Sequence, residues 1–331
     1  MKCLFCKTEI NNTNNSIEHI IPKFLGGHYV LYNVCKNCNS EMGEGFEREL
    51  SQNTVIKFFQ AFYHMKNRSG KFIVPDLKLK YTENMHIKAD DEGHLFMYTN
   101  SCVSDDGYRK ISIEIDQTES KEKIEELINK KVSRLNKKNN REDLGYEITR
   151  IEKKLVQGTP KDFSIKIDNN VLKQLCVKIA YEFSCICLGS KYFESNIAEI
   201  FRKIILDDED YLILNDLPIK LSYDKRQATY CINKVAEIAS ENTHNIYDKN
   251  KLNYPSHGNY THEIVLIHKQ GKIFARINLF NIIYGEICVS DNGSMYGFEK
   301  GEIIKLKMGM WDNKLFKKII TNYEELKRVL M

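Results

Sequence analysis

The sequence predicts an α+β protein in which a small zinc-stapled module, residues 1–70, precedes a larger mixed α+β domain, residues 71–331. Four of the ten cysteines stand in two tight pairs near the amino terminus, and the other six are scattered through the rest of the chain. After residue 70, stretches with strand-like alternation are mixed with stretches of helical periodicity. A chain of 331 residues, 42% of them hydrophobic, is long enough to bury a sizeable core.

The charge, the apolar runs and the cysteine positions limit the classes of protein to which the chain can belong. The net charge of +4 permits an anionic partner but does not require one, because a local patch matters more than the total. The sequence contains neither a basic-then-apolar leader at its start nor a run of the roughly eighteen apolar residues that a membrane span needs, so we expect a cytoplasmic protein. Cys176, Cys185 and Cys187 fall in an apolar helical pattern, where a reduced cysteine behaves as a small hydrophobe.

The first 70 residues predict a cysteine turn, two short strands around a glycine loop, and then a helix. Apolar residues recur at helical spacing over residues 41–63, with a break near residues 51–53. The polar run Asn-Arg-Ser-Gly at residues 67–70 is typical of a turn and marks the expected domain boundary.

The later elements alternate between strands and helices, with a second expected boundary near residue 168. Helices are expected over 119–139, 171–189 with Asn169 or Asn170 as its cap, 194–205 and 313–330. Strands are expected over 72–83, 85–98 with a turn at 90–93, 109–116, 146–155, 163–167, 261–267 and 272–280. The turn at residues 268–271 joins the last two strands as a β-hairpin.

The cysteine pairs predict a structural zinc site. Each CxxC turn brings two thiolates to one side of a knuckle, and two knuckles complete the tetrahedral sulfur shell that zinc prefers. The alternatives are unrelated free cysteines or a redox pair, although a redox CxxC needs only one pair. The doubled spacing favours zinc, with these four ligands: Cys3, Cys6, Cys35 and Cys38.

Between and just after the pairs lie residues whose order is specific. Glu18-His19 is followed by two apolar residues and Pro22, then by a Gly-Gly loop, Asn33, and Asn39 directly after the second CxxC. In this segment, residues 3–39, the sequence resembles the HNH endonuclease family, in the variant whose ββα-metal fold is clamped by two CxxC knuckles. The resemblance covers little more than residues 3–50.

The resemblance implies a role for each residue. His19 would deprotonate the attacking water, and an imidazole that is substantially neutral near pH 7 suits that task. Glu18 and Asn39 would hold one Mg²⁺ or Mn²⁺ through oxygen atoms, and Asn33 would fix the loop that orients His19. Without the resemblance, Glu18 and His19 would be interpreted as a surface ion pair. Asn39 would be interpreted as a helix cap and Asn33 as a turn residue. Many relatives carry another metal-binding histidine where this chain has Gly43, which leaves two protein ligands.

The resemblance implies a metal-dependent endonuclease that hydrolyses DNA, acting as a restriction or phage-defence effector, alone, with a protein partner or as a homo-oligomer. The alternatives are an RNA-cleaving HNH nuclease and a non-catalytic zinc ribbon that binds nucleic acid or protein. A basic stretch of the helix expected at 119–139 is either a set of phosphate contacts or a solvated helix face. Its members are Lys130, Lys131, Arg134 and Lys137.

Overall fold

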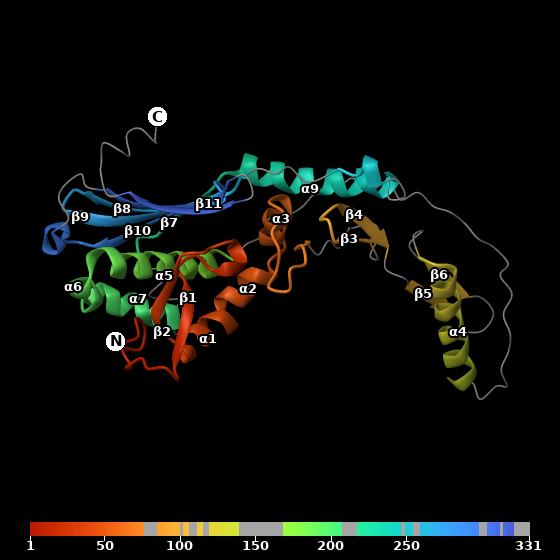
Figure 1. The fold of residues 1–331 in the computed structure, drawn as a ribbon, viewed down its shortest axis with the longest axis horizontal. Helices are drawn as coiled ribbons and strands as arrows, with labels where there is room; N and C mark the ends of the chain where they lie inside the picture. Colours follow the sequence, from red (N-terminus) through yellow and green to blue (C-terminus); the bar gives the residue numbers. More distant parts are fainter. Residues whose placement is uncertain are drawn as a thin grey trace. The chain divides into compact units, whose positions relative to one another are not determined.

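The computed structural model describes residues 1–75, 85–99, 102–105, 111–114, 119–138, 168–206, 217–245, 249–253, 259–297, 303–311 and 314–320. Helices and sheets are mixed, as expected, and the chain forms two compact units (Figure 1). The first unit comprises Met1–Ile73, Ser164–Lys234 and Ser256–Met331. The second comprises Val74–Phe163 and Val235–Pro255. The functional division of the chain at residue 70 stays a prediction.

The amino-terminal segment of the first unit is a hairpin followed by helices. Strands β1 (Asn15–His19) and β2 (Val30–Cys35) pair antiparallel, with the short helix η1 (Lys23–Leu25) in the loop between them. Three helices follow: α1 (Lys36–Glu44), α2 (Phe46–Gln52) and α3 (Thr54–Phe62). The Asn53 side chain accepts hydrogen bonds from the first amides of α3, so the break expected near residues 51–53 is confirmed as a helix cap.

A six-stranded antiparallel sheet forms the other layer of this unit, in the order β12-β11-β8-β9-β10-β7. Its strands are β7 (Lys220–Tyr223), β8 (Thr261–Lys269), β9 (Lys272–Leu279), β10 (Ile283–Ser290), β11 (Ile303–Trp311) and β12 (Lys314–Ile320). Buried and less buried residues alternate along β8 and β9, as they do in a sheet with one face on the core. The hairpin expected from residue 261 to 280 is therefore confirmed.

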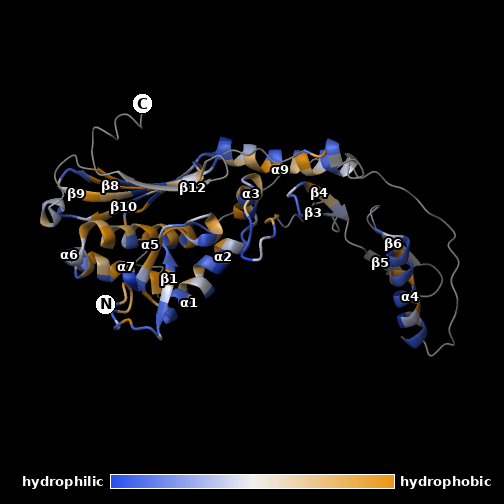
Figure 2. Cartoon of the chain, in the orientation of Figure 1, coloured by the Kyte–Doolittle hydropathy of each residue, from blue (hydrophilic) through white to orange (hydrophobic). Residues whose placement is uncertain are grey.

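Helix α5 (Asn169–Leu188) packs against the sheet and is the core of this unit (Figure 1). Its residues from Val171 to Cys185 are almost all buried, and Figure 2 shows the helix as largely hydrophobic. Helices α6 (Ser190–Phe193) and α7 (Asn196–Leu206) follow it. The side chain that caps α5 is Asp168, which accepts from the Asn170 amide, so the expected cap at Asn169 or Asn170 is wrong by one or two residues.

The second unit is described in part. It contains the hairpin of β3 (Met85–Ala89) and β4 (Leu95–Thr99), the pair β5 (Cys102–Asp105) and β6 (Ile111–Glu114), and helix α4 (Lys121–Lys138). The long helix α9 (Lys225–Asn245) begins in the first unit and contributes Val235–Asn245 to the second, and η2 (Lys249–Lys251) follows. Asn242 donates a 2.7 Å hydrogen bond to the Leu95 carbonyl, and this bond ties α9 to β4.

One expected element is wrong, and several others lie outside the part of the chain that the structure describes. The helix expected over 313–330 is wrong for Lys314–Ile320, which forms strand β12 by pairing with β11. Residues 76–83 of the strand expected over 72–83, residues 321–330 of the expected last helix, and the expected strands 146–155 and 163–167 lie outside the described residues. In the part of the chain that the structure describes, no helix has the length and apolar character needed to cross a membrane.

Candidate active site

The four paired cysteines meet at one end of the hairpin. Their sulfur atoms all lie within 4.8 Å of one another, and the Cys6 and Cys35 sulfurs are 3.6 Å apart. Zinc–sulfur bonds of about 2.3 Å place the sulfurs of a tetrahedral site about 3.8 Å apart, so the residues fit a structural zinc. A hydrogen bond from Cys38 lowers the pKa of Cys3 to about 4, and the same bond raises the pKa of Cys38.

Local structure explains why the knuckles form. The first knuckle is a tight turn in which the Cys3 amide donates to the Thr8 carbonyl at 2.8 Å and Lys7 adopts a positive φ of 61°. In the second knuckle, Cys35 ends β2 and Cys38 lies in the first turn of α1. The strand-to-helix junction therefore turns both sulfurs of the second pair toward the first.

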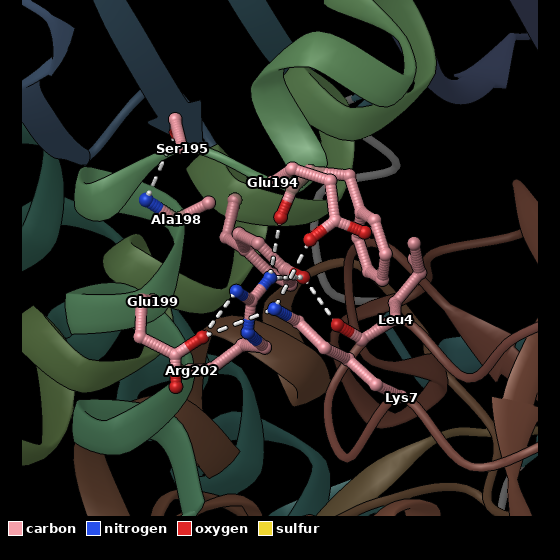
Figure 3. Close-up of polar contacts among 9 residues, drawn as sticks. Leu4, Lys7, Glu194, Ser195, Ala198, Glu199 and Arg202 are labelled. Atoms are coloured by element: carbon pink, nitrogen blue, oxygen red, sulfur yellow. Dashed lines mark hydrogen bonds and ion pairs between the residues drawn. The ribbon is translucent and has the colours of Figure 1, made fainter.

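Residues far along the chain brace the first knuckle (Figure 3). Lys7 forms ion pairs with Glu194 at 3.3 Å and with Glu199 at 3.4 Å. Arg202 on α7 donates to Glu199, to the Phe193 carbonyl and to the Tyr181 hydroxyl. The Tyr181 hydroxyl in turn donates to the Leu4 carbonyl inside the knuckle. The first knuckle is therefore attached to α5 and α7 and to the residues between them.

His19 is the last residue of β1 and is half-buried. Burial lowers the pKa of its imidazole below the usual value, because desolvation disfavours the charged form. A lowered pKa keeps the ring neutral near pH 7, and a neutral ring can accept a proton. A half-buried imidazole with a lowered pKa therefore lies at the end of the strand.

The two asparagines lie beside an irregularity in the hairpin. Ser16 pairs with Val34 and Glu18 with Leu31, so Ile17 alone faces the two residues Tyr32 and Asn33. The Asn33 carbonyl accepts a 2.8 Å bond from the Leu4 amide and so joins β2 to the first knuckle. Asn39, on α1, donates through its side-chain nitrogen to the Ile17 carbonyl at 2.9 Å. The structure thereby brings α1 and β1 together close to His19.

Glu18 points into the protein, which the sequence did not predict. It is 4% exposed, and its Oε1 lies 2.5 Å from the ammonium nitrogen of Lys178, a fully buried residue of α5. Glu47 and Glu182 also lie within ion-pair distance of Lys178. A signal was present in the sequence, because Lys178 and Glu182 are four residues apart in an otherwise apolar helix, where charged residues are buried only in pairs.

The basic residues of α4 belong to the second unit. Lys130, Arg134 and Lys137 are exposed, and Lys131 is half-buried. Their phosphate-binding role stays a prediction.

The comparisons with known proteins concern this same amino-terminal segment. Residues 3–55 match the model of a family described as HNH endonuclease, which confirms the resemblance. No curated protein and no solved structure gives a match. The matched residues run from the first knuckle to the start of α3, so they include both cysteine pairs, His19 and Asn39. The chain therefore carries an HNH-type module at its amino terminus.

Proposed function

We propose that this protein is a metal-dependent HNH endonuclease that hydrolyses phosphodiester bonds in DNA. The observation that carries the proposal is the match of residues 3–55, a segment that contains His19, to the HNH endonuclease family. In support, the four thiols have the geometry of a zinc site, and burial lowers the pKa of the imidazole at the end of β1. A protein that used the zinc ribbon only for binding would have no need of such a base.

In the proposed reaction, a ring nitrogen of His19 takes a proton from a water molecule, and the resulting hydroxide attacks the phosphorus. The bond between phosphorus and O3′ breaks, and the departing O3′ takes a proton from water, which leaves a 3′-hydroxyl and a 5′-phosphate. Asn33 and strand β2 would hold the backbone at His19 in place. The zinc, held by the four cysteines, would keep the hairpin and α1 in register and take no part in the chemistry.

The catalytic cation, Mg²⁺ or Mn²⁺, would be held by Glu18 and Asn39. The donor chemistry fits, because hard cations prefer carboxylate and amide oxygens. The side-chain nitrogen of Asn39 donates to the Ile17 carbonyl, so the side-chain oxygen of Asn39 points away from that bond. Lys178 bonds to one of the two Glu18 carboxylate oxygens, Oε1, and the other oxygen takes no part in that bond. When bound, such a cation neutralises charge on the phosphate and on the departing oxygen.

The remainder of the chain would direct the module to its target. We assign phosphate contacts to Lys130, Lys131, Arg134 and Lys137 of α4, since exposed basic side chains supply salt-sensitive affinity. The cellular role that we propose is restriction or defence against phage, in the cytoplasm. In support of a reducing location, none of the cysteine side chains that the structure describes is joined in a disulfide.

The test incubates purified, zinc-loaded protein with supercoiled plasmid and, separately, with single-stranded RNA of matched length, each with Mg²⁺, Mn²⁺ or EDTA. We expect metal-dependent nicking or linearisation of the plasmid that leaves 3′-hydroxyl and 5′-phosphate ends. Cleavage of RNA alone would replace DNA as the substrate. Binding of both without cleavage under any metal would overturn the nuclease assignment in favour of a binding module.

A further inference from the structure

The ammonium group of Lys178 is surrounded by oxygen atoms from three elements. Its nitrogen lies 2.5 Å from Glu18 Oε1, 2.5 Å from the His19 carbonyl and 3.3 Å from the Ile20 carbonyl. On its other sides it lies 3.3 Å from Glu47 of α2 and 3.4 Å from Glu182 of α5. Three consecutive residues of the proposed catalytic segment therefore bind one side chain that is about 160 residues further along the chain.

The charges in this cluster are uneven, with three carboxyl groups around one ammonium. Burial alone would lower the pKa of Lys178, but the charges of Glu18, Glu182 and Glu47 raise it above the usual value, so the ammonium stays charged. Burial raises the pKa of Glu182 and of Glu47. Of the three carboxyl groups, that of Glu18 lies closest to the ammonium, at 2.5 Å against 3.3 Å for Glu47 and 3.4 Å for Glu182.

Stability alone does not account for this arrangement. Taking a lysine and a glutamate out of water costs free energy that their attraction often only balances, and apolar side chains of the same volume would stabilise a fold as well. What apolar side chains cannot do is hold two backbone carbonyls. The Lys178 bonds to backbone carbonyls begin at the last residue of β1, where ladder pairing with β2 ends at His19 and Val30.

We propose that Lys178 is a positioning residue of the nuclease site: from α5 it fixes the backbone at His19 and the carboxylate of Glu18, so that the site is complete only when the module is seated on this helix. The inference rests on the proposed function and extends it to a residue outside the family match. Tyr181, one turn along α5, binds the Leu4 carbonyl of the first knuckle, so the same helix holds the zinc end and the catalytic end of the module.

The test uses the full chain with Lys178→Met, and Glu182→Gln as the matched control. Glu182 belongs to the same buried cluster and helix, but among the described residues neither of its carboxylate oxygens forms a hydrogen bond, and glutamine has nearly the same shape and volume. For Lys178→Met we expect kcat for plasmid cleavage to fall about 100-fold, the effect of a misplacement of about 1 Å. KM for DNA should change less than about twofold, since a side chain with 0% exposure cannot contact phosphate.

Rates are taken per folded, zinc-loaded molecule, well below the melting temperature of each variant. Should the methionine variant not fold, Lys178→Gln replaces it, because glutamine keeps donors for the His19 carbonyl but lacks the charge. For Lys178→Gln we expect a loss of about 10-fold in kcat, in line with the cost of losing one charge-assisted bond. Unchanged kcat, or a rise in KM alone, would overturn the positioning role.

Amide hydrogen exchange provides a second readout that does not depend on activity. Removing Lys178 should speed exchange at residues 17–21, whereas Glu182→Gln should leave exchange in that segment unchanged. If the wild-type protein cleaves nothing, the proposed function fails and exchange still decides whether Lys178 holds the segment. Equal exchange at residues 17–21 in the wild type and the Lys178 variant would contradict the inference even if the wild type is an active nuclease.

Discussion

Lowering the pH should weaken the attachment between the β1–β2 loop that contains η1 and the six-stranded sheet, because His262 makes that attachment. This fully buried residue of β8 accepts a hydrogen bond at Nδ1 from the Phe280 amide, at 3.2 Å. Its proton is therefore on Nε2, which donates to the Leu25 carbonyl at 2.7 Å. A second proton, on Nδ1, would point at the Phe280 N–H group, so protonation of the ring breaks the hydrogen bond between them.

The size of the effect follows from the shift of the pKa. Burial lowers the pKa of His262 from 6.5 to about 4. Between these values the unfolded chain binds more protons than the folded chain, so stability is complete above pH 6.5 and is lost as the pH falls toward 4. From pH 7.5 to pH 5 the loss attributable to His262 is roughly 2 kcal/mol.

The assay is urea unfolding at these two pH values, followed by the fluorescence of the single tryptophan, Trp311, which belongs to β11 of the same sheet. His262→Gln should be less stable than the wild type at pH 7.5. Between pH 7.5 and pH 5, its free energy of unfolding should fall by about 2 kcal/mol less than that of the wild type. Tyr260→Phe is the matched control: it removes the 3.3 Å bond to the Gly26 carbonyl of the same loop. That variant should lose about 1 kcal/mol at both pH values. A His262→Gln protein with the full pH dependence of the wild type would refute the reasoning.

Two further predictions concern the metal frame and the basic helix. The purified protein should contain one zinc ion per chain. Cys38→Ser or a chelator should remove this ion and lower the melting temperature, because zinc binding contributes to the free energy of folding. A zinc-free protein of unchanged stability would contradict this prediction. Replacing Lys130 and Arg134 of α4 by glutamate should weaken DNA binding and reduce the slope of log affinity against log salt by about 2. An unchanged slope would show that this face of α4 is merely solvated.

The clustering of the four paired cysteines and the hairpin of β8 and β9 could be predicted because both depend on local patterns. The CxxC spacing reports a turn, and alternation over a few residues reports a strand. The rest of the sheet depends on pairing between distant segments. Lys314–Ile320 carries three lysines and shows no strong alternation, yet it forms the strand β12 because the edge of β11 is there to pair with it.

The candidate site was predictable only in part, for a similar reason. The positions of His19, Asn33 and Asn39 follow from spacing relative to the cysteines, all within one short segment. The burial of Glu18 against Lys178 depends on α5 packing against the amino-terminal hairpin, and no local pattern contains that contact. Buried charges in an apolar helix are the one trace that such packing leaves in a sequence.

The most direct test of the nuclease assignment compares plasmid cleavage by the wild-type protein and by His19→Ala, at saturating Mg²⁺ or Mn²⁺ and equal zinc content. His86→Ala, which removes a histidine of the second unit, is the control. We predict that His19→Ala lowers the cleavage rate by at least about 100-fold, as expected for loss of a general base, while His86→Ala cleaves at the wild-type rate. Equal cleavage by His19→Ala and the wild type would contradict the account.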